Sequence, residues 1–349
     1  MAVYTDVSFE ELEAFLSAYA IGKTHVFKGI AEGVSNSNYY LQTDAGTFIL
    51  TLYEKRIDVA ELPFFLGLME HLARAGIPCP TPVHRRDGAL TGILNGRSAA
   101  ILTFLDGVSL RRPAAAHCAA AGRALADLHA KGAGFQQSRA NALGLESWRQ
   151  LAADCLQHAD AISQGLRTLI ESELAALGAG WPDGLPKGII HADFFPDNVL
   201  FVDDKVSGII DFYFACTEFL AYDLAVMLNA WCFENDGAFN ITKGRALFSG
   251  YQSARALTAD ERAALPILCR GGAMRFLLTR LYDWVNRTPE ALVRPKDPRE
   301  FVRRLRFHRT VRSPEAYGLA STSRRLPSSS GLSSRQISRP MGMLLTMSA

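Results

Sequence analysis

The spacing of hydrophobic and polar residues changes several times along the first hundred positions, which indicates a series of short elements. Apolar residues first recur at helical spacing, and Ser8 with Glu11 three positions later matches a capping box at a helix start. Aromatic and β-branched residues then dominate, with turn residues between them. The pattern predicts a helix at 6–20, strands at 24–30, 37–43 and TFILTLYE, a helix at 58–75, and strands near 82–94 and in RSAAILTFL.

After Asp106-Gly107 the hydrophobic pattern becomes mainly helical. The alanine-rich stretch AAAHCAAAGRALADLHA predicts a helix, and so do residues 145–178 and 221–309. Two short apolar runs bounded by turns, KGIIHADFFPDNVLFVD and KVSGIIDFYFA, indicate a small β element within this helical part. The order of elements predicts an α+β fold with a β-rich lobe followed by a larger, mainly helical lobe.

These changes of pattern divide the 349 residues into three parts. We expect an N-terminal lobe at 1–105, a C-terminal lobe at 106–312, and a tail at 313–349. The tail contains ten serines and no hydrophobic periodicity, so it is predicted to be disordered. Its arginines would allow contact with nucleic acid or anionic lipid, but we expect a solvated extension without function.

Composition narrows the functional class. The formal net charge of +2 gives the whole chain no electrostatic footprint for nucleic acid. We find neither an apolar leader at the N-terminus nor an apolar run long enough to span a membrane. The six cysteines form no C-x-x-C pair and no zinc-ligand spacing, which is typical of buried thiols. We therefore expect a soluble cytoplasmic protein.

The densest chemical cluster is His191-Ala192-Asp193-Phe194-Phe195-Pro196-Asp197-Asn198, with Asp211 following a second apolar run. Phosphoryl transfer from ATP needs a carboxylate that orients the acceptor hydroxyl and accepts its proton, which suits Asp193. It also needs hard oxygen ligands for Mg²⁺, which suits Asn198 and Asp211. We expect His191 to brace the loop. A polar turn between two strands is the alternative, but that alternative does not require this joint spacing.

The cluster resembles the catalytic loop and metal-binding aspartate of the aminoglycoside phosphotransferase and choline kinase group, relatives of the protein kinases. Those families carry H-G-D where this chain has His191-Ala192-Asp193. The resemblance covers roughly residues 10–310. It implies a bilobal protein-kinase-like fold and the use of ATP and Mg²⁺.

Longer segments in both lobes are similar to the family of bacterial homoserine kinases that have this fold. The segments are KGIAEGVSNSNYYLQT, FILTLYEKR, ELPFFLGLMEHLA, HADFFPDNVLF, GIIDFYFACTEFLAYDLAVMLNAWCF and GGAMRFLLTRLYDW. This similarity implies transfer of the ATP phosphate to the side-chain hydroxyl of L-homoserine, a step toward threonine. The oligomeric state is left open.

Nucleotide-binding residues are expected in the first lobe. The hairpin loop would cover the phosphates with backbone N–H groups, and its candidate residues are Gly29, Gly33, Ser35, Asn36 and Ser37. Strand three has Thr51 where relatives place a phosphate-binding lysine, so Lys55, Arg56 and Lys28 are the candidate cations. The helical partner acid is either Glu61 or Glu70. The segment 100–105 resembles the adenine-binding hinge, with candidate residues Thr103, Phe104 and Leu105.

A zwitterionic acceptor needs a cation for its carboxylate, and the arginine fork is suited to that role. The resemblance makes Arg275 and Arg280 the candidates. The residues expected to complete the pocket are Tyr213, Glu218, Trp231 and Asp283. Asp223 is expected to cap a helix or brace the catalytic loop.

Two other functions remain open at this point. A different acceptor, such as choline, a sugar or an aminoglycoside, would use the same catalytic loop. A polycationic aminoglycoside would require a strongly acidic site, whereas the C-terminal segments mix arginines with aromatics. A non-catalytic kinase-like binding module is supported only by the missing strand-three lysine, since Asp193, Asn198 and Asp211 are all present.

Overall fold

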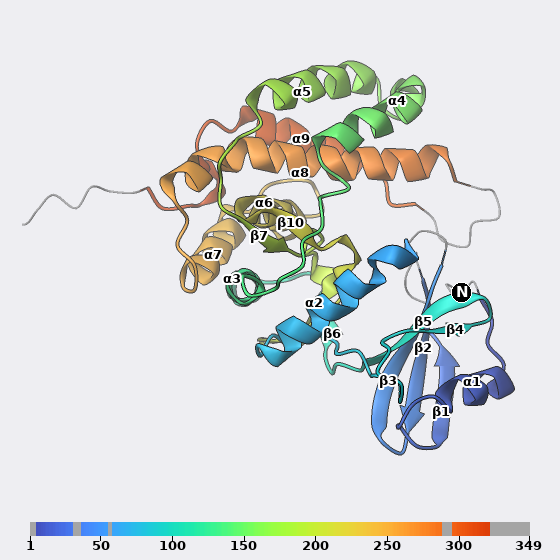
Figure 1. Cartoon of the computed structure of the whole chain (residues 1–349). Coiled ribbons are helices and arrows are strands. Elements are labelled where there is room, and N and C mark those ends of the chain that lie inside the picture. The colour runs from blue at the N-terminus through green and yellow to red at the C-terminus, as the bar shows by residue number, and fades with distance from the viewer. Residues whose placement is uncertain (1–4, 31–35, 55–57, 288–294, 322–349) are drawn as a thin grey trace, which may run out of the picture. The chain divides into compact units, whose positions relative to one another are not determined.

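A computed structural model of the chain describes residues 5–30, 36–54, 58–287 and 295–321. Residues up to Leu319 cluster as one unit, and the elements named below belong to it (Figure 1). In the part of the chain that is described, no helix is both long enough and apolar enough to cross a bilayer.

The N-terminal lobe is a five-stranded antiparallel sheet in the order β1-β2-β3-β5-β4. The strands are β1 (Thr24–Gly29), β2 (Asn36–Thr43), β3 (Gly46–Tyr53), β4 (Gly92–Leu94) and β5 (Arg97–Thr103). Side chains alternate along β3, so Leu50 and Leu52 belong to one buried cluster and Tyr53 to another. The Tyr53 face of β3 is therefore the face turned toward the catalytic residues, as its contact with Tyr213 confirms.

Three helical segments complete this lobe: α1 (Phe9–Leu16), the 3-10 helix η1 (Val59–Glu61) and α2 (Leu62–Arg74). The predicted capping box is present, because Ser8 accepts from the Glu11 N–H and Glu11 accepts from the Ser8 N–H. The helix is shorter than predicted at 6–20, because Tyr19 leaves it to form an isolated β-bridge with Arg85.

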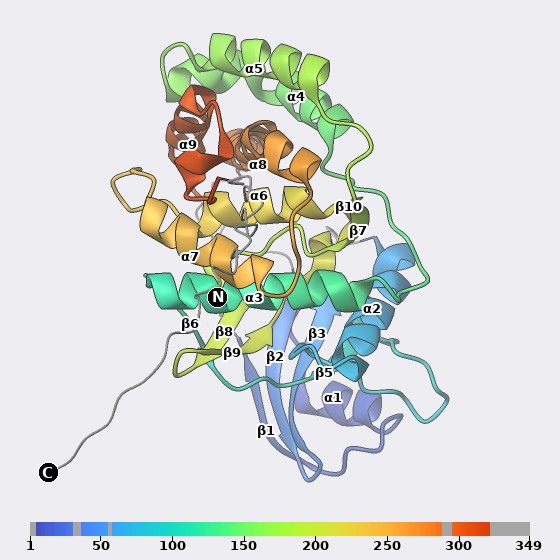
Figure 2. The same cartoon turned by 90° about the vertical axis from the view of Figure 1, so that its left-hand side faces the viewer.

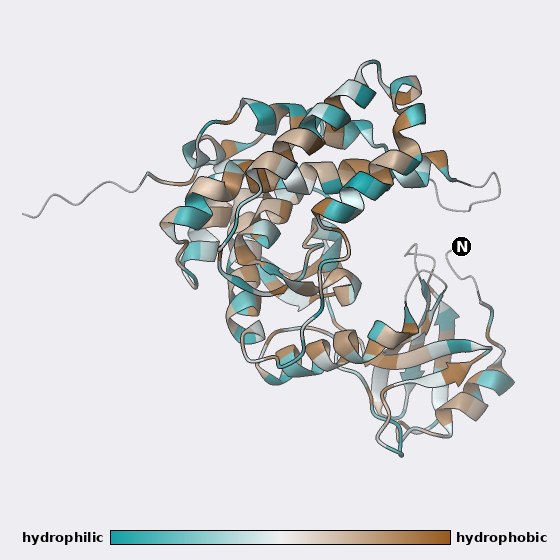
Figure 3. Ribbon diagram, turned by 45° about the horizontal axis from the view of Figure 1, so that its top comes forward, coloured by the Kyte–Doolittle hydropathy of each residue, from teal (hydrophilic) through white to brown (hydrophobic). Residues whose placement is uncertain are grey.

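The C-terminal lobe is mainly helical, as predicted. Its helices are α3 (Ala115–Gly132), α4 (Leu145–Ile162), α5 (Leu166–Gly180), α6 (Leu220–Trp231), α7 (Ile241–Gln252), α8 (Ala259–Val285), α9 (Arg299–Thr310) and the 3-10 helix η4 (Pro314–Tyr317). The predicted helical stretch 145–178 is two helices, because Ser163 is extended (φ -155°, ψ 123°) after the end of α4 and Gly165, in a left-handed conformation (φ 75°), precedes α5. The ribbon in Figure 3 alternates between hydrophobic and hydrophilic residues along these helices, as expected for helices with one buried face.

The close packing of α3 against α7 accounts for the many small residues in the alanine-rich helix. Figure 2 shows α3 lying beside α7. A Cβ added at Gly250 would lie 1.9 Å from the Ala119 carbonyl oxygen, and one at Gly122 would lie 2.4 Å from the Leu247 carbonyl oxygen. The two backbones are thus in direct contact, which only glycine and alanine allow.

The predicted β element of this lobe is present as two short sheets. One contains β6 (Val108–Ser109), β8 (Val199–Val202) and β9 (Lys205–Ile209), and the other contains β7 (Lys187–Ile190) and β10 (Cys216–Phe219). The turns between them contain the 3-10 helices η2 (Pro196–Asn198) and η3 (Phe212–Phe214). The chain segments between these strands carry the catalytic candidates. All six cysteines are free and buried, as their spacing predicted.

The boundary predicted at 312/313 is wrong, because the packed body continues to Leu319. Tyr317 and Leu319 are buried, and the Tyr317 hydroxyl is 2.9 Å from His308 Nδ1. Burial lowers the pKa of His308 to about 3, so this imidazole is neutral. Its Nε2–H donates to the Asn229 side-chain oxygen at 3.1 Å, and its Nδ1 accepts a hydrogen bond from the Tyr317 hydroxyl. The polar composition of this segment gives no indication that Tyr317 and Leu319 are buried. The remainder of the predicted tail, 322–349, lies outside the described residues.

We expect truncation after Arg312 to destabilise the protein, whereas truncation after Ser321 should leave its melting temperature unchanged. The first truncation removes Tyr317 and empties its buried site, and loss of a large aromatic from a core typically costs about 3–5 kcal/mol. The second removes no residue that the structure describes. Thermal unfolding followed by circular dichroism measures both. Equal melting temperatures for the two truncations would show that η4 contributes nothing to stability.

Candidate active site

The predicted catalytic loop follows β7 and leads through η2 into β8. The Asn198 amide nitrogen donates to the Asp193 carbonyl oxygen at 2.8 Å and to its carboxylate Oδ2 at 2.9 Å. Asp193 is thereby held in one orientation. The amide oxygen of Asn198 is the atom of this side chain that can coordinate a cation.

His191 is buried beneath the loop and holds its backbone. Its Nε2–H donates to the Ile210 carbonyl at 2.9 Å, and its Nδ1 accepts from the Asp193 N–H at 3.3 Å. Burial lowers the pKa of His191, although nearby carboxylates act in the opposite direction. The neutral ring therefore connects the Asp193 segment to the Asp211 segment, which is the bracing role expected of it.

Asp223 on α6 anchors the same turn from below. Its two carboxylate oxygens accept from the His191 N–H at 2.7 Å and the Ala192 N–H at 2.9 Å. His129 Nε2 lies 3.1 Å from Oδ2. Burial alone would raise the pKa of Asp223, but the hydrogen bond and charge of His129 and the contacts with His191 outweigh it, and the pKa is lowered. An ionised carboxylate thus fixes the turn at Ala192, whose φ of 62° is left-handed.

The β8–β9 hairpin brings the two predicted metal ligands together. Val199 pairs with Ile209, so the residues just outside this pair, Asn198 and Ile210, lie opposite each other. The Ile210 N–H donates to the Asn198 carbonyl at 3.0 Å. Asp211 follows directly in a left-handed conformation (φ 64°) that precedes η3. The hairpin register is therefore what places Asp211 beside the catalytic loop.

The two central carboxylates lie in an acidic environment, with Asp193 half-buried and the Asp211 side chain exposed. Burial raises the pKa of Asp193, although Arg275 and His191 oppose the shift. Burial, and then the charges of Asp193 and Asp197, raise the pKa of Asp211 to about 7. Such clustering of negative charge is expected where a divalent cation compensates it.

The residues present fit a magnesium ion that takes one or two ligands from the protein and others from the phosphates of a nucleotide. Among the described residues no group of three or more His, Cys, Asp or Glu side chains could hold a metal alone. Mg²⁺ commonly takes one or two protein oxygens and completes its shell with phosphate oxygens and water. Asp211 and Asn198 are the residues that could supply this partial set.

A cavity of about 200 Å³ lies next to the catalytic loop. Its lining residues are Asp58, Glu61, Phe65, Arg139, Asn141, Ala142, Leu143, Tyr213, Phe214 and Arg275. Arg275 Nη1 also donates to the Ala192 carbonyl, in a hydrogen bond between buried atoms. Tyr213 comes two residues after Asp211, and its hydroxyl is 3.1 Å from that of Tyr53. Two of the predicted acceptor residues, Arg275 and Tyr213, therefore line this cavity.

The other predicted acceptor residues lie elsewhere. Trp231 is buried and donates its indole N–H to the Phe194 carbonyl at 2.7 Å, so it supports the catalytic loop from beneath. Arg280 pairs with Glu300 of α9 and stacks on Phe301. It does not line the cavity, and its role as a carboxylate ligand stays a prediction.

Asp283 is exposed near the end of α8. Glu218, on β10, accepts from the Phe219 N–H at 3.0 Å and lies 3.5 Å from the Asn141 amide. Neither residue lines the cavity, so no acceptor contact follows for either from the geometry.

Of the residues predicted to bind the nucleotide phosphates, only some are among those that the structure describes. Gly33, Ser35 and Lys55 lie outside the described residues, and Gly29 is exposed at the end of β1. Asn36 and Ser37 are buried. Ser37 donates to Glu54 at 2.7 Å, and the Glu54 N–H donates to the Asn36 side chain at 3.4 Å. These two side chains hold β2 to the end of β3, and phosphate contact through the backbone of this segment stays a prediction.

The hinge candidates are largely engaged with the sheet. The Thr103 N–H donates to the Thr81 carbonyl at 3.0 Å, and the Phe104 N–H donates to the Thr47 carbonyl at 3.2 Å. A role of either N–H in binding adenine would require these bonds to open. Leu105 is half-buried beyond the end of β5.

Sequence reasoning missed Arg139. Its guanidinium forms two hydrogen bonds of 2.8 Å to the two carboxylate oxygens of Glu61. Glu70 pairs with Arg74 and His84. The candidate cations Lys55 and Arg56 lie outside the described residues, so the pairing of Glu61 or Glu70 with such a cation stays a prediction. Arg139 occupies an irregular connection between α3 and α4. The only local signal in the sequence is an arginine in a polar connection. This signal does not indicate that Glu61 is the partner of Arg139.

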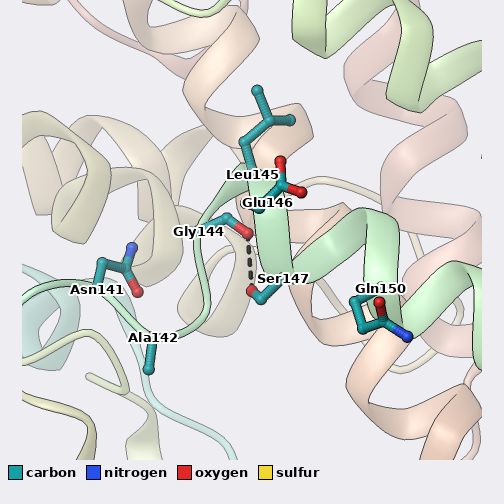
Figure 4. Close-up of a pocket in the computed structure, with 7 residues that line it drawn as sticks. All are labelled: Asn141, Ala142, Gly144, Leu145, Glu146, Ser147 and Gln150. Atoms are coloured by element: carbon teal, nitrogen blue, oxygen red, sulfur yellow. Dashed lines mark hydrogen bonds between the residues drawn. The ribbon is translucent and has the colours of Figure 1, made fainter.

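A second, open depression of about 540 Å³ lies where α4 begins (Figure 4). It is lined by Asn141, Ala142, Gly144, Leu145, Glu146, Ser147 and Gln150. The Ser147 hydroxyl donates to the Gly144 carbonyl at 2.8 Å and so caps no N–H group. Asn141 and Ala142 line both this depression and the smaller cavity.

Comparison with known proteins identifies the class. A family model described as the phosphotransferase enzyme family matches residues 26–257. The chain belongs to this phosphotransferase family, and as a member of a kinase family it uses ATP and a small-molecule substrate.

Curated relatives are similar over nearly the whole chain. A homoserine kinase of Xanthobacter autotrophicus is 60% identical over 321 residues, covering 92% of this chain and 100% of that protein. A homoserine kinase of Parvibaculum lavamentivorans is 59% identical over 319 residues, covering 91% of this chain and 99% of that protein.

Solved structures confirm the predicted kinase-like fold. An amicoumacin kinase in complex with AMP-PNP and Ca²⁺ matches with a TM-score of 0.64 at 14% identity, covering 87% of this chain and 92% of that one. A choline kinase from Cryptosporidium parvum matches with a TM-score of 0.62 at 13% identity, covering 87% and 95%. At these identities the similarity concerns the fold alone.

Proposed function

We propose that this protein phosphorylates the side-chain hydroxyl of L-homoserine with ATP, giving O-phospho-L-homoserine. The identity of about 60% to curated homoserine kinases over 92% of the chain carries the proposal. The cavity beside the catalytic loop supports it. Its lining contains two carboxylates, Asp58 and Glu61, and two guanidinium groups, Arg139 and Arg275. This balanced charge suits a small zwitterion better than a polycationic aminoglycoside or choline.

In this proposal Asp193 is the general base. It aims the acceptor hydroxyl at the terminal phosphate and accepts its proton as the oxygen–phosphorus bond forms. The raised pKa of Asp193 makes it a stronger base than an exposed aspartate. Asn198 positions Asp193 by donating a hydrogen bond to the Asp193 carboxylate. His191 positions it by accepting a hydrogen bond from the Asp193 backbone N–H.

Asn198 and Asp211 would hold Mg²⁺, which supplies charge neutralisation at the ATP phosphates. The hairpin register and the acidic surroundings of Asp211 support this assignment. For the nucleotide, we propose the backbone of the β1–β2 loop beginning at Gly29, and the chain near Leu105 for the adenine. Gly33, Ser35 and Lys55 stay predictions outside the described residues.

We further propose that residues 1–105 form the nucleotide-binding lobe and that the following residues to Leu319 carry the base and most of the acceptor cavity, which Asp58, Glu61 and Phe65 complete from the first lobe. A cytoplasmic location is also part of the proposal, and it is supported by six cysteines that are all free and buried.

We expect L-homoserine to be the preferred acceptor in a panel that also contains choline, a simple sugar and kanamycin. A site built for two charged groups discriminates strongly against acceptors lacking them, so kcat/KM should favour L-homoserine by at least ~10²-fold. ADP release measures the rates, and ³¹P NMR identifies the product. Faster phosphorylation of choline or kanamycin would overturn the proposed function.

A further inference from the structure

The Arg139–Glu61 pair is held rigidly at the wall of the cavity beside the catalytic loop. Besides the two bonds to Glu61, Arg139 Nη1 donates to the Ala215 carbonyl at 3.2 Å, and the guanidinium lies 5.0 Å from the centre of the Phe65 ring. The Thr217 N–H donates to the Arg139 carbonyl at 2.7 Å. The guanidinium is thus positioned from several sides before any ligand arrives.

The pair remains accessible from the cavity. Glu61 is 35% exposed and Arg139 is 14% exposed. Exchange of this pair for an equivalent pair of ligand charges leaves both side chains neutralised and replaces each charged hydrogen bond with another. The ligand that can make this exchange must present a carboxylate to the arginine fork and a cation to the glutamate.

The size and position of the cavity restrict that ligand further. About 200 Å³ is below the ~300–1,000 Å³ typical of sites for drug-sized ligands, so the cavity suits a metabolite of few heavy atoms. Arg275 lines it and bonds to the Ala192 carbonyl, one residue before Asp193. A short ligand bound at Arg139 and Glu61 would therefore extend its other end toward the proposed base.

We propose that Arg139 and Glu61 form an amino-acid clamp for the acceptor: the α-carboxylate binds Arg139, the α-ammonium binds Glu61, and the two charges of the substrate replace the internal ion pair. The inference rests on the proposed function, since it explains how an amino acid would be selected. It assigns selectivity to a residue pair 78 positions apart in the sequence.

The test compares three acceptors in three proteins. L-homoserine carries both charges, its methyl ester lacks the carboxylate, and 4-hydroxybutyrate lacks the ammonium. The wild-type enzyme should lose about 10–100-fold in kcat/KM for each analogue, as expected for a missing charged hydrogen bond. Arg139→Ala should raise KM for L-homoserine by a similar factor, with a smaller change in kcat, and should abolish the discrimination between L-homoserine and its ester. Glu61→Gln should abolish the discrimination against 4-hydroxybutyrate instead.

Arg167→Ala is the matched control, because Arg167 pairs with Glu171 in an exposed helical pair away from the cavity. It should retain both discriminations. If Arg139→Ala unfolds, Arg139→Lys keeps the charge without the fork and should reduce the ester discrimination partly. A purely structural role would lower kcat/KM equally for all three acceptors.

The outcomes separate the two proposals. If the wild-type enzyme forms no O-phospho-L-homoserine, the proposed function fails and the clamp fails with it. If the wild-type enzyme forms the product but the folded variants keep both discriminations in full, the clamp alone is overturned.

Discussion

Replacement of Asp193 by asparagine is expected to lower kcat by about 10²–10⁴-fold, the usual contribution of a general base. The variant keeps the size of the side chain and can still accept the hydrogen bond from Asn198, so the loop should stay in place. It loses the charge that accepts the hydroxyl proton in the transition state, so kcat should fall more than the KM values rise. Steady-state kinetics on protein with an unchanged melting temperature measures the effect.

Asp197→Asn is the matched control for this substitution. Asp197 lies in the same loop but is 59% exposed and pairs with Lys296 at 3.2 Å. The control should remain within a few-fold of the wild-type rate. If Asp193→Asn also remains within a few-fold, Asp193 is not the base.

Asp211→Ala is expected to nearly abolish turnover and to weaken the dependence of the rate on Mg²⁺. Loss of an outer-shell partner of a metal site already costs about 10–100-fold in affinity or activity, and loss of a ligand should cost more. The substitution also removes a negative charge that the neighbouring Asp193 and Asp197 disfavour, so the free protein should not become less stable for electrostatic reasons. Initial rates over a Mg²⁺ titration, with a thermal melt alongside, separate the two effects.

Asp204→Ala provides the comparison for Asp211→Ala, because Asp204 is an exposed carboxylate in the turn of the same β8–β9 hairpin. Its Mg²⁺ titration should match that of the wild-type enzyme. An Asp211→Ala enzyme with the wild-type Mg²⁺ midpoint would show that Asp211 is not a ligand.

The central part of the site could be predicted from sequence because its chemistry is local. His191, Asp193 and Asn198 lie within eight positions, and a two-stranded hairpin returns the chain to Asp211. The hydrophobic periodicity likewise predicted the sheet and most helices, since each element buries one face. Composition could not reveal Tyr317, a single buried aromatic that extends the packed body beyond the predicted boundary.

The acceptor residues were harder to predict because they depend on tertiary contacts. Arg275 and Arg280 are five residues apart, which is about 140° around a helix, so they point in different directions. Only Arg275 lines the cavity, while Arg280 packs on α9. The Arg139–Glu61 pair joins the irregular α3–α4 connection to the end of η1, far apart in sequence, and no local spacing indicates it. Trp231 shows the same limit, since an aromatic residue can line a pocket or support a loop equally well.

The buried cysteines make the protein convenient for site-specific labelling. Burial raises the pKa of the Cys79 and Cys216 thiols to about 12 and of the Cys118 and Cys155 thiols to about 11, and it also raises the pKa of Cys232 and Cys269. Maleimide reagents attack the thiolate, which these residues hardly form in the folded state. A pair of cysteines introduced at exposed positions, one in each lobe, would then be the preferred sites for donor and acceptor dyes. Opening and closing of the lobes during turnover could be followed by energy transfer in an otherwise unmodified enzyme.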